Sequence, residues 1–311
     1  MRHALHRLTA ALAMLVFCGA ANAQQPTKMR LGFTGSAGFV SVMIAKDHGF
    51  FEKRGLDVEM VFMTKGSIIV PSILGGSLEA GTLTAPSLIR SVEAKMDLVI
   101  LSATNVNSPS DTTSRLALRN GLTISNPKDL EGKKIGAAGI GGVLDTVFRQ
   151  WALDRGVDPK KLTFLEVGFP QMGDMLKSGK IDAATVSEPF LSRLVESGSG
   201  QAGINYFADF PDGMLLGGFV VKRSWAEANR AAALAFREAV RDAVALLQKD
   251  PTVAYASLEK HLKLPSDVVK KLPRVKAVVD VTDEQLEFWN KLSKEQGLTR
   301  TLVDVKKLYF N

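Results

Sequence analysis

The chain has 311 residues, of which 46% are hydrophobic and 23% are charged, and its formal net charge is +7. This composition is typical of a globular protein long enough for two domains, and it excludes a disordered chain. The basic residues are scattered along the sequence, so a solvated surface is the better interpretation and no nucleic-acid partner is expected.

Residues 1–23 have the pattern of a cleavable signal peptide. A basic start with Arg2 and Arg7 precedes an apolar run over 8–17, and Ala21-Asn22-Ala23 is a small-x-small cleavage site. The apolar run is too short to span a membrane. The one cysteine of the chain, Cys18, lies inside this segment. We therefore expect a mature protein that uses neither disulfides nor thiol chemistry.

The next hundred residues alternate between strand and helix patterns. This alternation predicts a largely parallel sheet with covering helices. The expected strands are 30–33, 56–63, 78–83 and 98–103, and the expected helices are 39–48, 68–74 and a third from Pro86.

The same order then recurs about 100 residues later. Gly35, Gly55 and Gly76 have counterparts in Gly139, Gly156 and Gly179, at offsets of about 104, 101 and 103 residues. The second copy predicts strands over 134–138, 162–167 and 181–186, and helices over 143–155, 170–176 and from Pro189. Two copies on one chain predict two related lobes with a cleft between them.

The repeat also sets the expected domain organisation of this α/β protein. We expect one lobe from residues 24–116 plus 221–311 and a second lobe from 117–220. The chain would cross between the lobes near 116–118 and again near 218–221, which makes a two-segment hinge. The C-terminal part is expected to be helical over 225–249 and 283–296 and to return to the first lobe.

Ligands of open parallel sheets bind beyond the carboxyl ends of the strands, so the strand-to-helix loops are the expected site. Glycine, serine and threonine at these helix starts leave free N–H groups, which suit an anion. Ordinary helix capping explains each loop equally well by itself, and the argument depends on both lobes having such loops at matched positions. The loops are 35–38, 65–67 and 84–86 in the first copy and 139–142, 169–170 and 187–189 in the second.

Four side chains could give this site its specificity. Lys65 is the fixed positive charge of these loops, and it would either meet an anionic ligand or lie on the surface. Glu188 lies where the first copy has Ala85, and it would either accept hydrogen bonds from a ligand or cap the helix that follows. Phe39 and Phe169 would wall the site or belong to the core.

Catalysis has little support in this sequence. Beyond the signal peptide only His48 and His261 remain as histidines, and no cysteine remains. A zinc site or a Cys/His or Ser/His centre is therefore poorly supplied. The Gly139-x-Gly141 pair begins like a dinucleotide fingerprint, but Leu144 occupies the position of the third glycine. We expect no enzyme, no cofactor and no metal.

Several runs resemble solute-binding proteins of ABC importers of the nitrate/sulfonate/taurine class, in a superfamily that also includes thiamine-pyrimidine-precursor proteins. The runs are 44–59 (IAKDHGFFEKRGLDVE), 129–136 (DLEGKKIG), 176–183 (LKSGKIDA) and Glu188-Pro189. The resemblance implies a two-lobed periplasmic binding protein fold of type II that closes on its ligand and delivers it to an inner-membrane permease. Carried onto this sequence, the family's binding positions are Gly35-Ser36-Ala37, Lys65-Gly66-Ser67, Thr84-Ala85, Gly139-Ile140-Gly141 and Glu188.

These observations predict a monomeric periplasmic protein that binds a small organic anion, such as a sulfonate or a carboxylate. Two other interpretations remain open. The same fold could bind a pyrimidine-like or aromatic nutrient, or the cleft could belong to a secreted enzyme with Glu188 as its general base. The pyrimidine synthase branch of the superfamily relies on a cysteine-rich motif, which the mature chain lacks.

Overall fold

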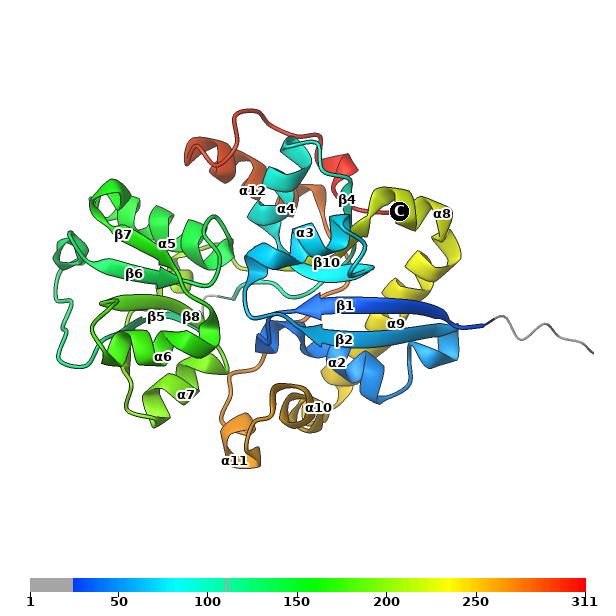
Figure 1. Cartoon of the computed structure of the whole chain (residues 1–311), viewed down its shortest axis with the longest axis horizontal. Coiled ribbons are helices and arrows are strands. Elements are labelled where there is room, and N and C mark those ends of the chain that lie inside the picture. Colours follow the sequence, from blue (N-terminus) through cyan, green and yellow to red (C-terminus); the bar gives the residue numbers. More distant parts are fainter. Residues whose placement is uncertain (1–24, 109, 111) are drawn as a thin grey trace, which may run out of the picture.

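The computed structural model describes residues 25–108, 110 and 112–311, which form two α/β lobes side by side (Figure 1). Each lobe is built around one five-stranded sheet, with strand orders β2-β1-β3-β10-β4 and β7-β6-β8-β5-β9. The expected signal peptide lies outside the described residues, and it stays a prediction.

The first lobe contains the first copy of the repeat and the C-terminal part of the chain. Its opening elements are β1 (Thr27–Phe33), α2 (Val40–Asp47), β2 (Leu56–Phe62), α3 (Ile69–Leu74), β3 (Ala80–Thr84), α4 (Ala85–Glu93) and β4 (Leu98–Ala103). The chain later returns as β10 (Gly217–Lys222), α8 (Arg223–Ala228), α9 (Arg230–Lys249), α10 (Val253–Leu262), α11 (Ser266–Val269) and α12 (Asp283–Glu295).

The second lobe contains the second copy. Its elements are β5 (Ser114–Leu118), β6 (Lys134–Ala137), α5 (Val143–Asp154), β7 (Thr163–Glu166), α6 (Phe169–Lys177), β8 (Ala183–Ser187), α7 (Phe190–Glu196) and the short β9 (Gln201–Ala202).

The two sheets are copies of one topology, as the repeat predicts. In each, the first strand of the copy lies between the second and the third, with parallel pairing. One strand of each sheet runs antiparallel to its neighbours, and it is the strand beside a crossing between the lobes, β10 or β5. Both sheets are therefore largely parallel, and the carboxyl ends of their parallel strands face the same cleft.

The recurring glycines have a conformational cause. Gly55, Gly76, Gly156 and Gly179 all have φ between 68° and 78°, in the left-handed region that side chains with a Cβ avoid. They end a helical turn and send the chain into the next strand at matched places in both copies.

Strand pairing also bears on where the lobes divide. The expected divisions after residues 116 and 220 fall inside β5 and β10, and each of these strands pairs as a whole with one sheet. We propose that the division follows the pairing, so that the crossing segments are 104–113 and 203–216.

The C-terminal helices complete the first lobe and also contact the second. The expected helix over 225–249 is two helices, because Asn229 leaves the helical conformation (φ −122°, ψ 43°) and its side chain donates to the Trp225 carbonyl. Helix α12 is begun by a capping box at Thr282. Just after it, Gln296 donates from Nε2 to the Thr146 carbonyl of α5 at 3.0 Å, which joins the C-terminal part to the second lobe.

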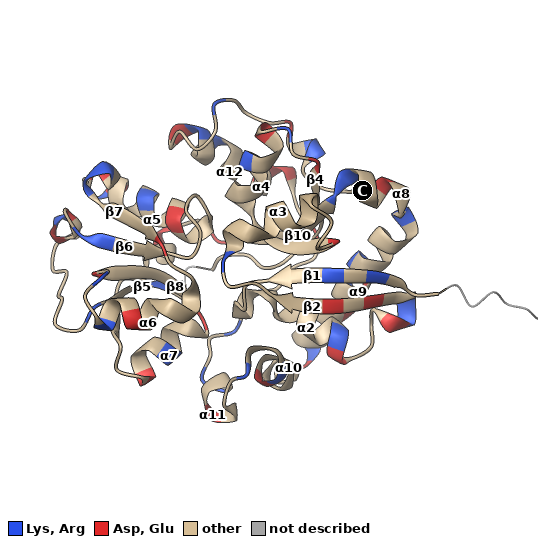
Figure 2. Ribbon diagram, viewed as in Figure 1, with Lys and Arg blue, Asp and Glu red and all other residues tan. Residues whose placement is uncertain are grey.

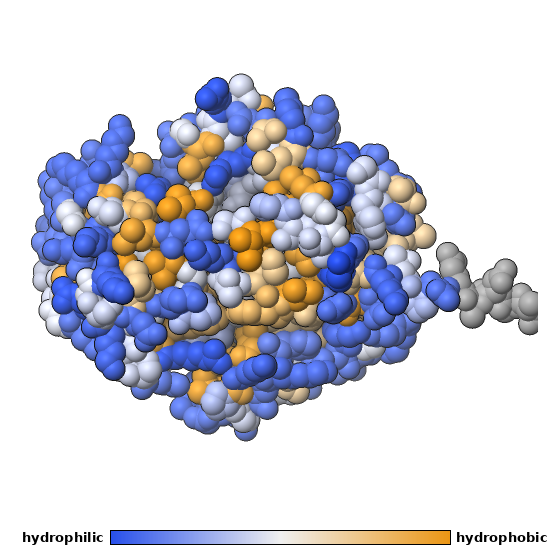
Figure 3. All heavy atoms as spheres, viewed as in Figure 1, coloured by the Kyte–Doolittle hydropathy of each residue, from blue (hydrophilic) through white to orange (hydrophobic). Residues whose placement is uncertain are grey.

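The surface fits the expectation of a solvated exterior. Lysine and arginine are interspersed with aspartate and glutamate over the ribbon (Figure 2). Hydrophilic residues cover most of the face in Figure 3, and apolar residues gather near the junction of the lobes. None of the described helices is both long and apolar enough to cross a membrane.

Candidate ligand-binding site

A cavity of about 720 Å³ lies between the lobes, at the carboxyl ends of the parallel strands. Its volume is in the range that holds drug-sized organic molecules, which is roughly 300–1,000 Å³. Ten of the fourteen expected site residues line it: Ser36, Ala37, Phe39, Gly66, Ser67, Thr84, Gly139, Ile140, Phe169 and Glu188.

The other four expected residues do not line the cavity. Gly35 lies beneath Phe62, whose ring atom would be 2.8 Å from an added Cβ. Ala85, the first residue of α4, is completely buried in the core. Gly141 points toward Arg90, and Lys65 stands at the start of the short 3₁₀ turn over 66–68. The positive charge expected from Lys65 is therefore not part of the lining.

The opposing loops of the two lobes are already in contact across the cavity. The first loop of lobe one meets the third loop of lobe two, because the Ala37 N–H donates to the Glu188 carbonyl at 3.0 Å. The second segments meet where the Ser67 hydroxyl donates to Glu166 Oε1 at 2.6 Å. These two hydrogen bonds join the lobes at the edge of the cavity.

The reciprocal contact is made by Arg90, which sequence reasoning missed. It lies on α4 after the third strand of lobe one, and its Nη1 donates to the Ile140 carbonyl in the first loop of lobe two at 3.0 Å. The loops thus pair as first with third, second with second and third with first. Such a pattern is typical of an approximate two-fold relation between two copies of one unit.

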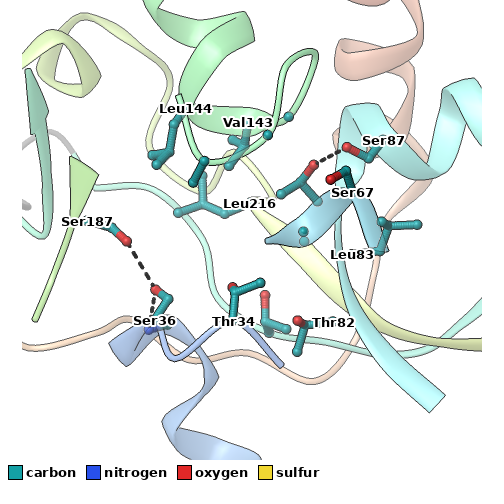
Figure 4. A pocket seen from close by; sticks show the side chains of 18 of the residues that line it. Thr34, Ser36, Ser67, Thr82, Leu83, Ser87, Val143, Leu144, Ser187 and Leu216 are labelled. Carbon is teal, nitrogen blue, oxygen red and sulfur yellow. Dashed lines mark hydrogen bonds between the residues drawn. The ribbon is translucent and has the colours of Figure 1, made fainter. Parts of the chain in front are cut away.

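On lobe one, hydroxyl groups crowd the strand ends. We call Thr34, Ser36, Thr82, Thr84 and Ser87 the floor of the cavity. Thr82 is only 4% exposed, and its hydroxyl has no hydrogen-bond partner among the described residues. An unpaired hydroxyl beside a cavity is a natural partner for a ligand, since leaving its hydrogen bond unmade costs free energy. Figure 4 shows Thr34, Ser36 and Thr82 together on one side.

The start of α5 in lobe two presents apolar side chains instead. Val143 and Leu144 of α5 lie on the opposite side of the cavity from Thr34 and Thr82 (Figure 4). The repeat shows the same difference at one matched position. Ile140 stands 104 residues after Ser36, so the second copy has an apolar side chain where the first copy has a hydroxyl. Most of the lining hydroxyls therefore belong to lobe one, and lobe two adds those of Ser114 and Ser187.

The start of α5 is also a poorer anion site than the sequence predicts. Asp145, which is completely buried, accepts from the Gly141 N–H at 2.7 Å and from Arg149 Nε at 2.9 Å. Its carboxylate occupies the positive end of the helix that would otherwise face a ligand anion. The position that matches Asp145 in the first copy is Ser41, which carries no charge.

Glu188 has the geometry of the helix-cap interpretation. Its two carboxylate oxygens accept from the N–H and the hydroxyl of Ser192, at 3.1 and 3.0 Å. Burial raises the pKa of the Glu188 carboxyl, while the bonds from Ser192 oppose this shift. Its backbone, by contrast, forms part of the contact between the lobes through Ala37.

The lining has little fixed charge. Arg90 is the one lysine or arginine among the described lining residues, and Glu93 and Glu188 are the acids. Glu93 is held away from the floor, because its carboxylate accepts from the backbone N–H groups of Arg300 and Thr301. These hydrogen bonds lower the pKa of Glu93. No cluster of three metal-ligating side chains occurs among the residues described here.

Comparison with known proteins places this architecture in context. Residues 22–258 match the model of the NMT1-like family. The nitrate/nitrite binding protein NrtA of Nostoc sp. (strain PCC 7120) is 26% identical over 246 residues, which are 72% of this chain and 55% of that protein. The chain spans about half to two thirds of the length of the curated NrtA relatives it matches.

Solved structures share the fold. The alkanesulfonate-binding protein SsuA from Xanthomonas axonopodis pv. citri, bound to MOPS, superposes with a TM-score of 0.75 at 19% identity, covering 92% of this chain and 99% of that one. The periplasmic nitrate-binding protein NrtA from Synechocystis PCC 6803 gives 0.78 at 19% identity, covering 91% and 86%. The expected two-lobed α/β fold is confirmed. Because the family model matches well over half of its residues, the chain belongs to the NMT1-like family.

Proposed function

We propose that this protein is the substrate-binding component of an ABC importer, which captures a small organic anion of the sulfonate or carboxylate type in the periplasm and delivers it to a permease. The observation that carries the proposal is the cavity enclosed between two lobes whose loops contact each other at three matched places. Closure around a ligand by a two-segment hinge is how such a site presents its occupied state to a partner.

The relatives support transport rather than catalysis. The proteins compared above carry the names of binding proteins for nitrate, nitrite and alkanesulfonates. The cavity favours the larger of these ligand types, because a volume of about 720 Å³ far exceeds what a single inorganic anion needs. Arg90 provides positive charge for an anionic head, and the floor hydroxyls provide hydrogen bonds.

A pyrimidine-like or aromatic ligand is the second candidate. Phe169 lines the cavity and stacks on Phe190 with ring centroids 5.0 Å apart, which offers a flat apolar wall. In addition, a formylaminopyrimidine-binding protein from Halalkalibacterium halodurans is 28% identical over 141 residues, 45% of this chain.

The test uses the chain without residues 1–23, purified and freed of bound ligand by partial unfolding and refolding. Thermal unfolding is measured with nitrate, sulfonates, carboxylates and pyrimidines, and hits are titrated by calorimetry. We expect an organic sulfonate or carboxylate to raise the Tm, since a ligand at 100 times its Kd stabilises by about 2.7 kcal/mol. Stabilisation by nitrate or by pyrimidines alone would reject the proposed ligand class. Turnover of a hit would reject the transport role.

A further inference from the structure

The cavity does not end at the cleft between the lobes. Its lining continues from Thr84 along α4, through Ser87 and Ser91 to Ala94 and then to Met96, and Arg90 and Glu93 of the same helix line it as well. Residues three and four apart lie on the same face of a helix, so this spacing describes a channel along the helix axis. At about 1.5 Å per residue, it extends roughly 15 Å from Thr84 to Ala94.

The second side of the channel is α3, the preceding helix of the same lobe. Gly66 and Ser67 line the cavity at the start of this segment, Val70 and Pro71 line it farther along, and Leu74 lines it at the end. Helices α3 and α4 therefore run outward together, with the cavity between them. We call the apolar outer part, lined by Val70, Pro71, Leu74, Ala94, Met96 and Leu298, the outer channel.

Polarity changes along this path. The inner end consists of the floor hydroxyls, whereas most of the outer lining is aliphatic side chains and Met96, which is 38% exposed. Three polar residues of α4, Arg90, Ser91 and Glu93, also line this part of the cavity. Leu298 is brought to the far end by the 298–301 segment, because Glu93 Oε1 accepts from the backbone N–H groups of Arg300 and Thr301 at 2.8 and 3.0 Å. The far end is thus built by long-range contacts of the C-terminal part.

We propose that the outer channel is a subsite for the apolar tail of an amphipathic organic anion, whose head is bound at the floor. The inference rests on the proposed function and deepens it, because it gives the ligand a direction and a shape. The occupant is part of the same small molecule, since the outer channel is continuous with the floor. A sulfonate or carboxylate with a linear chain fits this arrangement better than a compact anion.

Chain length is the variable that tests the subsite. The mature protein is titrated by calorimetry with ethane-, butane-, hexane- and octanesulfonate, and with carboxylates of the same chain lengths. Each methylene that moves from water into the outer channel is expected to tighten binding about fourfold until the channel is full. Affinity that is independent of chain length would overturn the proposal, while still leaving a bound anion and the proposed function intact. Absence of binding by every probe would instead count against the proposed ligand class.

Two variants separate the subsites. Ala94→Phe fills the outer channel from an exposed position at the end of α4, so it should remove the gain for hexane- and octanesulfonate and leave ethanesulfonate unchanged. Ser87→Ala removes a floor hydroxyl and should weaken every probe by a similar factor of about two to ten. The matched control is Ala231→Phe, at an exposed position of α9 outside the lining. A wild-type length dependence in Ala94→Phe, or an equal loss in Ala231→Phe, would refute the subsite.

Discussion

The contact between Arg90 and the first loop of lobe two is the clearest place to test how closure is coupled to ligand binding. Gly141 has φ +73°, and a Cβ at this position would lie 1.8 Å from Arg90 Nη1. The substitution Gly141→Ala therefore does two separable things. It strains the loop, and it displaces the guanidinium from the Ile140 carbonyl, which it now meets at 3.0 Å.

The two effects have different magnitudes and different readouts. Holding alanine in the left-handed region costs about 1–2 kcal/mol, and the loop carries this strain whether the lobes are open or closed. This backbone strain should lower the free energy of unfolding without changing the Kd. Loss of the Arg90 contact removes about 0.5–1.5 kcal/mol from the closed form alone. The Kd for a ligand found in the thermal screen should therefore rise about two- to tenfold.

A double-mutant cycle with Arg90→Ala provides the assay. Unfolding in urea gives the stability change, and calorimetry gives the Kd. In the Arg90→Ala background, Gly141→Ala should still destabilise the fold but should no longer change the Kd. Gly139→Ala, where an added Cβ meets nothing within 4 Å, is the control for alanine in this loop. A rise in Kd that persists without Arg90 would refute the reasoning.

Three further predictions follow from contacts on either side of the cleft. Burial raises the pKa of Glu188. The difference in free energy of unfolding between wild type and Glu188→Gln should therefore favour wild type most below pH 4.5, and it should fall as the pH rises through the raised pKa. A difference in thermal unfolding that is constant with pH would contradict this. Partial burial raises the pKa of Asp47, but hydrogen bonds led by that from Lys260 outweigh this effect and lower it. Asp47→Asn should therefore destabilise the protein above pH 3.8, and the loss of stability measured by thermal unfolding should vanish in stronger acid. Arg193 of lobe two donates to the carbonyl of Leu262 at the end of α10 in lobe one, so this contact joins the lobes in the closed form. Arg193→Ala should therefore raise the Kd about two- to tenfold in calorimetry and leave the Tm of the free protein within about 2 °C.

Sequence alone could predict the positions of most elements and of the loops that form the site. Gly55, Gly76, Gly156 and Gly179 are informative because a left-handed turn selects glycine locally, whatever the rest of the chain does. Strand and helix periodicity is likewise local, and the order of elements limits the possible sheet topologies to few. Because these signals are local, both copies of the repeat can be recognised in the amino-acid sequence itself.

The tertiary structure decided which of those loops meet and what lines the space between them. Arg90 and Met96 gave no local signal in the sequence. Arg90 matters because it contacts Ile140, more than 40 residues later, and Met96 lines the cavity together with Leu298, more than 200 residues later. Lys65 was expected in the lining and is absent from it, and the carboxylate of Glu188 is bonded to its own helix. A residue's type is fixed by the sequence, but the direction of its side chain depends on packing that only the assembled lobes define.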